Sequence, residues 1–208
     1  MLALAILSHL QVKPMHPYEM ATVLRERGKD RDMKIKWGSL YTVVANLGKH
    51  GFIRAVQSER KGARPERTVY EITDAGRTEL ADWVRELVGV PEREFPRFEA
   101  GLSVLGVLPP DEVAELLRGR LAALEEQLAQ ARAVLEASRH IPRLFLIEAE
   151  YDLAVRQAEA DWVRGLLGEI ADGSLPGLEL WRGWHASGAD PAELPRLMEA
   201  LLEGGGQK

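Results

Sequence analysis

The stretch that most constrains this chain is residues 37–53, which read WGSLYTVVANLGKHGFI. Four apolar residues in it recur at the three- and four-residue spacing of one helical face: Leu40, Val43, Val44 and Leu47. The opposite face carries small, polar or basic side chains: Thr42, Ala45, Asn46 and Lys49. Ser39 is expected to cap this helix, and Gly51 to end it in a left-handed conformation. A helix with one apolar face and one slim, hydrogen-bonding face fits the DNA major groove.

A basic β-hairpin is predicted directly after this helix. Residues 52–58 and 67–72 are rich in strand-forming side chains, and the segment between them contains Gly62 and Pro65. Its tip and edges carry four cations: Arg60, Lys61, Arg64 and Arg67. Cations so close together repel one another, and a phosphate backbone would relieve that repulsion. A solvated loop is the alternative for the hairpin alone, but its position after a helix-turn-helix favours a DNA-binding wing.

The residues before 37 complete a helix-turn-helix pattern. Residues 2–12 are almost entirely apolar and predict a buried helix, and a second helix is expected to begin at Pro17 and end at Gly28. Three helices with short connections match the helix-turn-helix arrangement, in which the last helix enters the groove. A further amphipathic helix over 73–87 is expected to be capped by Thr73. We therefore predict a winged helix-turn-helix domain over residues 1–88.

The rest of the chain predicts a helical dimerisation domain over residues 89–172. A coiled-coil seam is expected on a helix over 111–138, formed by Leu117, Leu121, Leu124, Leu128, Ala131 and Leu135. A second helix, over 143–171, repeats the interval with Leu144, Ile147, Tyr151, Ala154, Ala158 and Trp162. The two are expected to form an antiparallel hairpin whose apolar stripe is too wide for two helices to cover, which predicts a homodimer. Residues 173–208 form a tail with a short terminal helix and no assigned role.

Charge and composition narrow the class of function. The net charge is −5, but residues 1–80 hold 14 Lys and Arg against 9 Asp and Glu, while the remainder holds 13 against 23. A basic front half and an acidic back half suggest two separate tasks. The absence of cysteine excludes disulfides and thiolate sites. The five histidines are scattered and no catalytic motif is present, so we expect neither an enzyme, nor a metal site, nor a cofactor. Without a secretory signal or an apolar run of membrane-spanning length, we expect a cytoplasmic protein.

Three segments resemble the PadR family of transcriptional regulators: HPYEM (16–20), GSLYTVVANLGKHGFI (38–53) and VYEITDAGRTEL (69–80). Residues 95–124 and 158–170 resemble the longer helical C-terminal type in that family. Thr42 departs from the pattern, because many members have proline or arginine after the tyrosine. The resemblance implies a mainly α fold with a small β-hairpin wing. It also implies a homodimeric repressor that binds a dyad operator and is released by a small aromatic or lipophilic effector.

The predicted DNA-binding residues are Lys36, Ser39, Tyr41, Thr42, Asn46, Lys49, Arg60, Lys61, Arg64 and Arg67. Asparagine can form a bidentate pair with adenine, whereas serine, tyrosine and lysine more often contact phosphate. Core packing beneath the wing is the alternative for Tyr41, and a simple solvent-facing role is the alternative for Asn46. Trp83 and Trp162 are candidates for stacking on a flat effector, with core packing as the alternative. A helical adaptor without DNA binding is the alternative function, but it does not explain the cations between 60 and 67.

Overall fold

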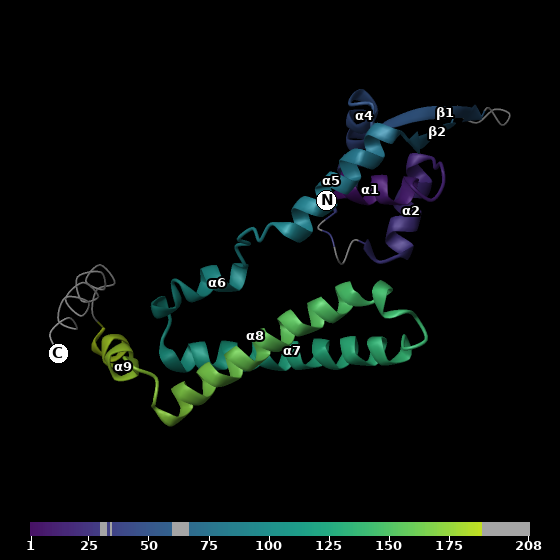
Figure 1. Cartoon of the computed structure of the whole chain (residues 1–208). Coiled ribbons are helices and arrows are strands. Elements are labelled where there is room, and N and C mark those ends of the chain that lie inside the picture. The colour runs from purple at the N-terminus through teal and green to yellow at the C-terminus, as the bar shows by residue number, and fades with distance from the viewer. Residues whose placement is uncertain (30–32, 34, 60–66, 189–208) are drawn as a thin grey trace. The chain divides into compact units, whose positions relative to one another are not determined.

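A computed structural model describes residues 1–29, 33, 35–59 and 67–188 of the 208-residue chain. The chain divides into two compact units, residues 1–94 and 95–208, and each is described by itself (Figure 1). The described residues are mostly helical, with one two-stranded antiparallel hairpin. This confirms the predicted mainly α fold with a small β-hairpin.

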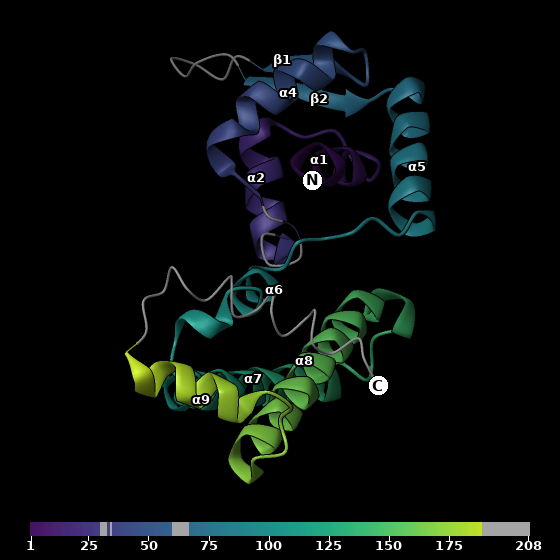
Figure 2. The same ribbon diagram turned by 90° about the vertical axis from the view of Figure 1, so that its left-hand side faces the viewer.

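The first unit surrounds the apolar helix α1. Its elements are α1 (Leu2–Leu10), α2 (Pro17–Glu26), the 3-10 turn η1 (Trp37–Ser39), α4 (Leu40–Lys49), β1 (Ile53–Glu59), β2 (Arg67–Ile72) and α5 (Asp74–Gly89). Figure 2 shows α1 framed by α2, α4 and α5, all of which contact it. Ile6 and Leu7 of α1 are completely buried, and residues from every one of these elements join the same core. The nearly all-apolar sequence of α1 therefore follows from its central position.

Helix α2 begins at the HPYEM segment because that segment satisfies the helix's first backbone groups. The Nδ1 atom of His16 accepts a hydrogen bond from the Tyr18 amide at 3.1 Å. In return, the Glu19 carboxylate accepts one from the His16 amide at 3.0 Å. Pro17 occupies the first helical position, where its missing N–H costs nothing, and Met20 is completely buried. Gly28 follows the helix with a φ of +67°, as predicted.

The β-hairpin is joined to the turn between α1 and α2. Ile53 pairs with Ile72 at its base, and both side chains are buried in the core, while a bulge lies between Ala55 and Gln57. The Met15 and Tyr70 backbones exchange two hydrogen bonds of 3.0 Å, which adds an isolated bridge beside β2. The hairpin therefore projects from the helical core as a wing does.

The second unit is built on a long helical hairpin. It contains α6 (Arg97–Leu102), the 3-10 turns η2 (Leu105–Val107) and η3 (Arg143–Phe145), α7 (Pro110–Ala137), α8 (Ile147–Asp172) and α9 (Leu178–Ser187). Helices α7 and α8 run antiparallel and side by side (Figure 1). The seam predicted on α7 is correct, because Leu117, Leu124 and Leu128 are buried. Its other members, Leu121, Ala131 and Leu135, are half-buried.

The seam predicted on α8 is wrong. Its six members are all exposed in the protomer: Leu144, Ile147, Tyr151, Ala154, Ala158 and Trp162. The residues that pack toward α7 instead are Leu153, Ala160 and Val163, with Ile170 buried nearer the end of the helix. The reason is that the inner face of α8 also carries polar cross-links. Arg156 donates to the Gln127 side chain on α7 at 2.7 Å, and Gln157 accepts from Arg132. The apolar stripe predicted from the sequence therefore lies on the face of α8 that points away from α7.

Residues 173–188, the first part of the predicted tail, pack within the second unit. Gly173 and Gly177 have positive φ and set the turn into α9, where Leu178 is buried. The Trp181 Nε1–H donates to the Leu108 carbonyl at 2.9 Å, and His185 Nε2 lies 3.0 Å from the Gly106 carbonyl. Two side chains of α9 thus bind the backbone of the segment between α6 and α7. The short terminal helix expected after residue 190 lies outside the described residues.

Candidate nucleic-acid interface

Helix α4 has the two faces that its sequence predicts. Leu40, Val44 and Leu47 are buried in the core of the first unit, and Val43 is half-buried against it. The predicted outer face is exposed throughout: Thr42, Ala45, Asn46 and Lys49. Tyr41 is 65% exposed, which excludes the alternative that its ring packs beneath the wing. Successive turns of α4 therefore expose hydroxyl, amide and ammonium groups on the surface of the first unit.

Ser39 does not cap α4, contrary to the sequence prediction. Its backbone (φ −96°, ψ 2°) lacks the extended conformation that directs a capping side chain toward the following amides. The hydroxyl donates instead to the Lys36 carbonyl at 2.8 Å, which closes the 3-10 turn η1. Lys36 itself is exposed, as a phosphate-contacting residue requires.

Sequence reasoning missed two features on α2 that bear on this interface. The Arg25 guanidinium lies over the Trp37 ring, 4.4 Å from its centroid, and so ties the end of α2 to the turn that enters α4. No spacing rule connects these two positions across a charged linker. Tyr18, on the first turn of α2, is largely exposed beside the first helical amides.

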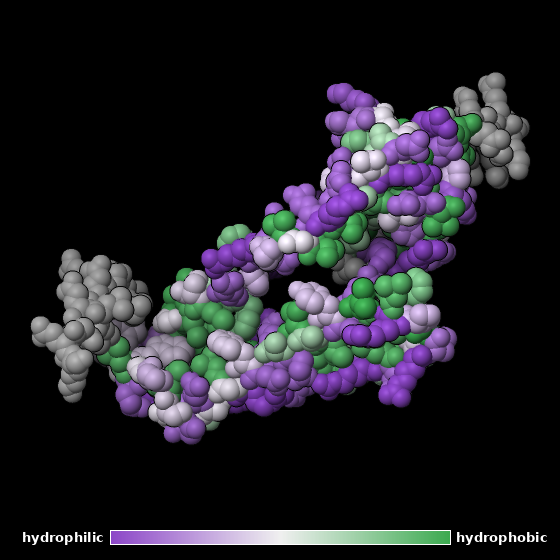
Figure 3. Space-filling view, in the orientation of Figure 1, coloured by the Kyte–Doolittle hydropathy of each residue, from purple (hydrophilic) through white to green (hydrophobic). Residues whose placement is uncertain are grey.

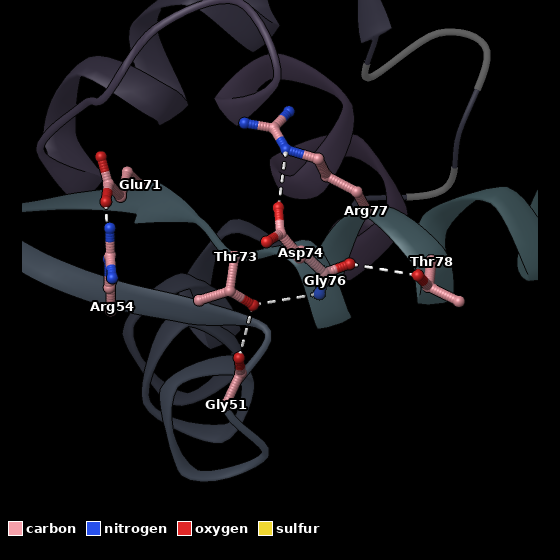
Figure 4. A network of polar contacts seen from close by, with 8 residues as sticks. All are labelled: Gly51, Arg54, Glu71, Thr73, Asp74, Gly76, Arg77 and Thr78. Carbon is pink, nitrogen blue, oxygen red and sulfur yellow. Dashed lines mark hydrogen bonds and ion pairs between the residues drawn. The ribbon is translucent and has the colours of Figure 1, made fainter.

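A polar joint fixes the far end of α4 to the base of the wing (Figure 4). The Thr73 hydroxyl donates to the Gly51 carbonyl at 2.6 Å and accepts from the Gly76 amide at 3.1 Å. It therefore caps α5, as predicted, and holds the turn that ends α4, where Gly51 has the predicted positive φ of +74°. The Thr73 amide also donates to the Phe52 carbonyl at 3.0 Å.

The structure explains why the TDAG sequence has a glycine at position 76. A Cβ atom at this position would lie 2.1 Å from the Phe52 carbonyl oxygen, a distance that no side chain tolerates. The first turn of α5 can approach the start of β1 only because residue 76 has no side chain. The joint thus sets the spacing between α4 and the hairpin through backbone contacts.

One cation of the β-hairpin, Arg54, is paired within the protein. Arg54 and Glu71 are register partners, and their side chains form an ion pair at 2.6 Å, so this cation is balanced within the protein (Figure 4). Arg60, Lys61 and Arg64 lie outside the described residues. Arg67 begins β2, but its side chain is likewise not described. Their DNA contacts stay a prediction.

The two candidate effector residues belong to different units. Trp83 is half-buried on α5 and packs against the core of the first unit. Trp162 is on α8, 51% exposed, with its ring edge-on to Phe98 at a centroid distance of 6.0 Å. The described residues contain no group of three metal-ligating side chains. Within the same part of the chain, no helix combines the length and apolar character needed to cross a membrane.

A helix backed by an apolar core, exposing a polar face and braced against a two-stranded wing, defines a winged helix-turn-helix protein of the DNA-binding class. The model of the PadR-like family of transcriptional regulators matches residues 6–82, which covers this arrangement. Residues 6–82 therefore carry the PadR-like family domain, and members of that family are DNA-binding transcription factors rather than enzymes.

Two curated relatives share sequence with the chain. The negative transcriptional regulator PadR of Bacillus subtilis is 24% identical over 132 residues, which are 64% of this chain and 71% of that protein. Erythronolide synthase EryA2 of Saccharopolyspora erythraea is 30% identical over 183 residues, 74% of this chain. The chain spans only 5% of the length of that synthase.

Solved structures show the same fold. Bacillus subtilis PadR in complex with operator DNA superimposes with a TM-score of 0.67 at 21% identity, covering 81% of this chain and 98% of that one. The same protein in complex with p-coumaric acid gives a TM-score of 0.66 at 21% identity, with coverage of 82% and 98%. The Vibrio cholerae virulence activator AphA gives 0.62 at 21% identity, with coverage of 83% and 99%.

Proposed function

We propose that this chain is a homodimeric repressor that binds a dyad operator through α4 and the wing and releases it on binding a small aromatic or lipophilic effector. The observation that carries the proposal is the outward face of α4, which is exposed, free of acidic side chains and held at both ends by the rest of the winged helix. Bacillus subtilis PadR, which has the same fold, was solved with operator DNA, which supports the DNA partner. A regulator of chromosomal genes acts in the cytoplasm.

Each predicted contact is assigned by side-chain chemistry. Asn46, in the middle of the exposed face, pairs with adenine, whereas Tyr41, Thr42 and Lys49 contact phosphate or base edges around it. Lys36 contacts phosphate ahead of the helix, and Ser39 does so by exchanging its hydroxyl hydrogen bond to the Lys36 carbonyl for one to a phosphate oxygen. The wing supplies the remaining cations to the phosphate backbone or the minor groove: Arg60, Lys61, Arg64 and Arg67.

The proposed dimer forms through the outer face of α8. This face carries an apolar stripe that α7 does not cover, and Figure 3 shows apolar surface along the hairpin. Its largest members are exposed in the protomer: Ile147, Tyr151, Val155 and Trp162. Such a stripe on a monomer is costly in water, and a second copy packed by two-fold symmetry would cover both stripes at once. Two winged helices would then face two operator half-sites.

The effector class is proposed from two observations. Trp162 presents a half-exposed ring on the dimer stripe, so an effector stacked on it lies at the contact between the two copies, and a neighbour of the same fold was solved with p-coumaric acid. Trp83, packed against the winged-helix core, is the second candidate. Repression is the proposed sign of regulation, and a reporter fused to the promoter decides it, because AphA shares this fold and is an activator.

Fluorescence anisotropy with the DNA upstream of the chain's own gene tests the proposal. If the dimer neutralises about six phosphates, log K falls with log salt with a slope of about −5. Asn46→Ala should weaken specific binding by about tenfold or more, because each bidentate contact between a side chain and a base is worth about 1–3 kcal/mol. Lys49→Ala removes one phosphate contact per subunit and should reduce the slope by about 2.

Arg85→Ala is the matched control, because Arg85 lies on α5 of the same unit and is paired with Asp82. It should bind DNA as the unchanged protein does. A slope near zero, or an equal loss in Arg85→Ala and Lys49→Ala, contradicts the assigned interface. A protein that dimerises but binds no DNA at any salt concentration would instead support the helical adaptor.

A further inference from the structure

Arg25, in the last turn of α2, differs from the paired arginines of the first unit. Arg54, Arg77 and Arg85 each form an ion pair with a nearby carboxylate. Arg25 is exposed and, in the part of the chain that the structure describes, pairs with no carboxylate. Its contact is instead with Trp37, whose ring centroid lies 4.4 Å from the guanidinium carbon. The described residues therefore leave the charge of Arg25 without a counter-charge.

Trp37 holds this cation in a defined place. Its ring is half-buried and packs against the core of the first unit, so it is a firm support. An arginine that moves freely in water loses side-chain freedom when it binds an anion, whereas one already held on a ring loses less. The cation–π contact uses none of the N–H donors in a hydrogen bond to an oxygen. The guanidinium can therefore still form two parallel hydrogen bonds to a phosphate.

The held guanidinium lies at the entry to α4. Trp37 is the first residue of η1, which leads directly into α4, and the exposed Lys36 precedes it. Two cations thus belong to one short region at the start of the helix that is proposed to enter the groove. Because the phosphate backbones border the major groove on both sides, cations beside the start of a groove-bound helix lie where phosphates are.

We propose that Arg25, held on Trp37, binds a backbone phosphate of the operator and forms a two-cation phosphate site with Lys36. Such a contact reads no base, but it adds affinity and fixes the register of α4 in the groove. This inference rests on the proposed DNA-binding function and adds to it a contact from α2, an element that supplies none of the predicted contacts. The competing partner for Arg25 is a carboxylate of the protein itself, such as one from the acidic second unit.

Fluorescence anisotropy at a series of salt concentrations tests the site, with the DNA upstream of the chain's own gene and a scrambled duplex of the same length. Arg25→Gln removes one phosphate contact per subunit and should reduce the slope of log K against log salt by about 2. At about 0.1 M salt it should weaken binding to both duplexes by the same factor, about tenfold or more, because a phosphate contact carries no sequence information. Arg85→Gln, the same charge change at a paired arginine, should leave both unchanged.

Two further variants separate the charge of Arg25 from its support. Arg25→Lys keeps the charge and should keep the salt slope, but it should weaken binding to both duplexes several-fold, because an ammonium group lacks the two parallel donors. Trp37→Leu keeps every cation and an apolar side chain against the core. It should also keep the slope and weaken binding several-fold, since the guanidinium is then no longer held in place. Circular dichroism confirms that each variant is folded, and Arg25→Lys tests the site if Trp37→Leu is not.

Two results would overturn the inference while the proposed function stands. An unchanged slope in Arg25→Gln, with a lower unfolding free energy, would assign Arg25 to a carboxylate of the protein. A larger loss on the operator than on the scrambled duplex would show that Arg25 only positions α4. A slope near zero in the unchanged protein would instead contradict DNA binding itself, so the failure of this site and the failure of the proposed function give different results.

Discussion

Helices α4 and α8 have the same kind of amphipathic pattern, yet the apolar face is buried within the protomer in one and exposed in the other. In α4 the apolar face packs on α1 and the wing, and the polar face is outside. In α8 an apolar stripe that includes Tyr151 and Trp162 is outside, and the inner face combines Ala160 and Val163 with paired polar groups. Periodicity thus locates an apolar stripe on a helix without stating which molecule covers it. Where one chain leaves such a face uncovered, a second copy is the proposed cover.

The strongest test of this difference uses two alanines on α8. Ala158 belongs to the stripe that the sequence predicts as the seam, whereas Ala160 is completely buried against α7. Ala160→Asp places an unpaired charge in the hairpin core and should cost about 4 kcal/mol of unfolding free energy. Ala158→Asp should leave the helical content unchanged but convert the dimer to a monomer. Circular dichroism and sedimentation velocity measure the two effects.

Ala158→Ser is the control, because it keeps a small side chain on the stripe without charge and should stay dimeric. Equal loss of stability in Ala158→Asp and Ala160→Asp would show that the stripe packs within the protomer after all. A dimer that persists in Ala158→Asp would remove the outer face of α8 from the interface.

Most of the first unit is predictable from sequence because its signals are local. Pro17, Gly28, Gly51 and Thr73 each act on the backbone of a neighbouring turn, and each does what its residue type predicts. Ser39 fails because the chain forms an extra 3-10 turn there, and the Ser39–Lys36 bond that closes this turn competes with the cap. For the four correct predictions and for Ser39 alike, the contacts that decide the outcome join residues a few positions apart in the sequence.

The second unit is less predictable because its contacts join distant residues. The position of α9 depends on Trp181 and His185 reaching backbone carbonyls more than 70 residues earlier. The inner face of α8 depends on pairs such as Arg156 with Gln127. Similarly, Arg25 and Trp37 in the candidate DNA interface lie in separate elements with a charged segment between them. No spacing pattern in the sequence encodes such partners, whereas the polar outer face of α4 follows from periodicity alone.

Two glycines test whether the first unit is held as rigidly as its local signals suggest. Gly76→Ala places a Cβ against the Phe52 carbonyl and should cost about 3 kcal/mol, because the backbone must move to admit it. Gly48→Ala, in α4, meets no atom within 4 Å and should stabilise the helix by about 0.5–1 kcal/mol. Urea denaturation followed by tryptophan fluorescence reports both changes. A Gly76→Ala protein as stable as the original would show that the joint between α4 and the wing yields easily.

The smallest expected effect concerns the buried histidine in the core of the first unit. Within the described residues, one of its ring nitrogens is unpaired, whereas the polar side chains between α7 and α8 are paired. His9 is 5% exposed, and its Nδ1 donates to the Ala5 carbonyl at 3.0 Å. The Nε2 atom is buried with no hydrogen-bond partner among the residues that the structure describes. Burial lowers the pKa of His9 below its ordinary value of 6.5, and the nearby Arg27 and Lys29 lower it further. The neutral ring is therefore the form that fits this core.

The direction of the pH dependence follows from the lowered pKa. As the pH falls below about 6.5, the unfolded chain takes up a proton that the folded protein still excludes, so the unfolding free energy decreases until the folded pKa is reached. His9→Leu should abolish this part of the decrease between about pH 7.5 and pH 5, measured by urea midpoints. His50→Gln is the control, since His50 makes the same kind of bond, to the Asn46 carbonyl at 2.7 Å, but is exposed. A full pH dependence in His9→Leu would show that the unpaired nitrogen does not limit the acid stability of the winged helix.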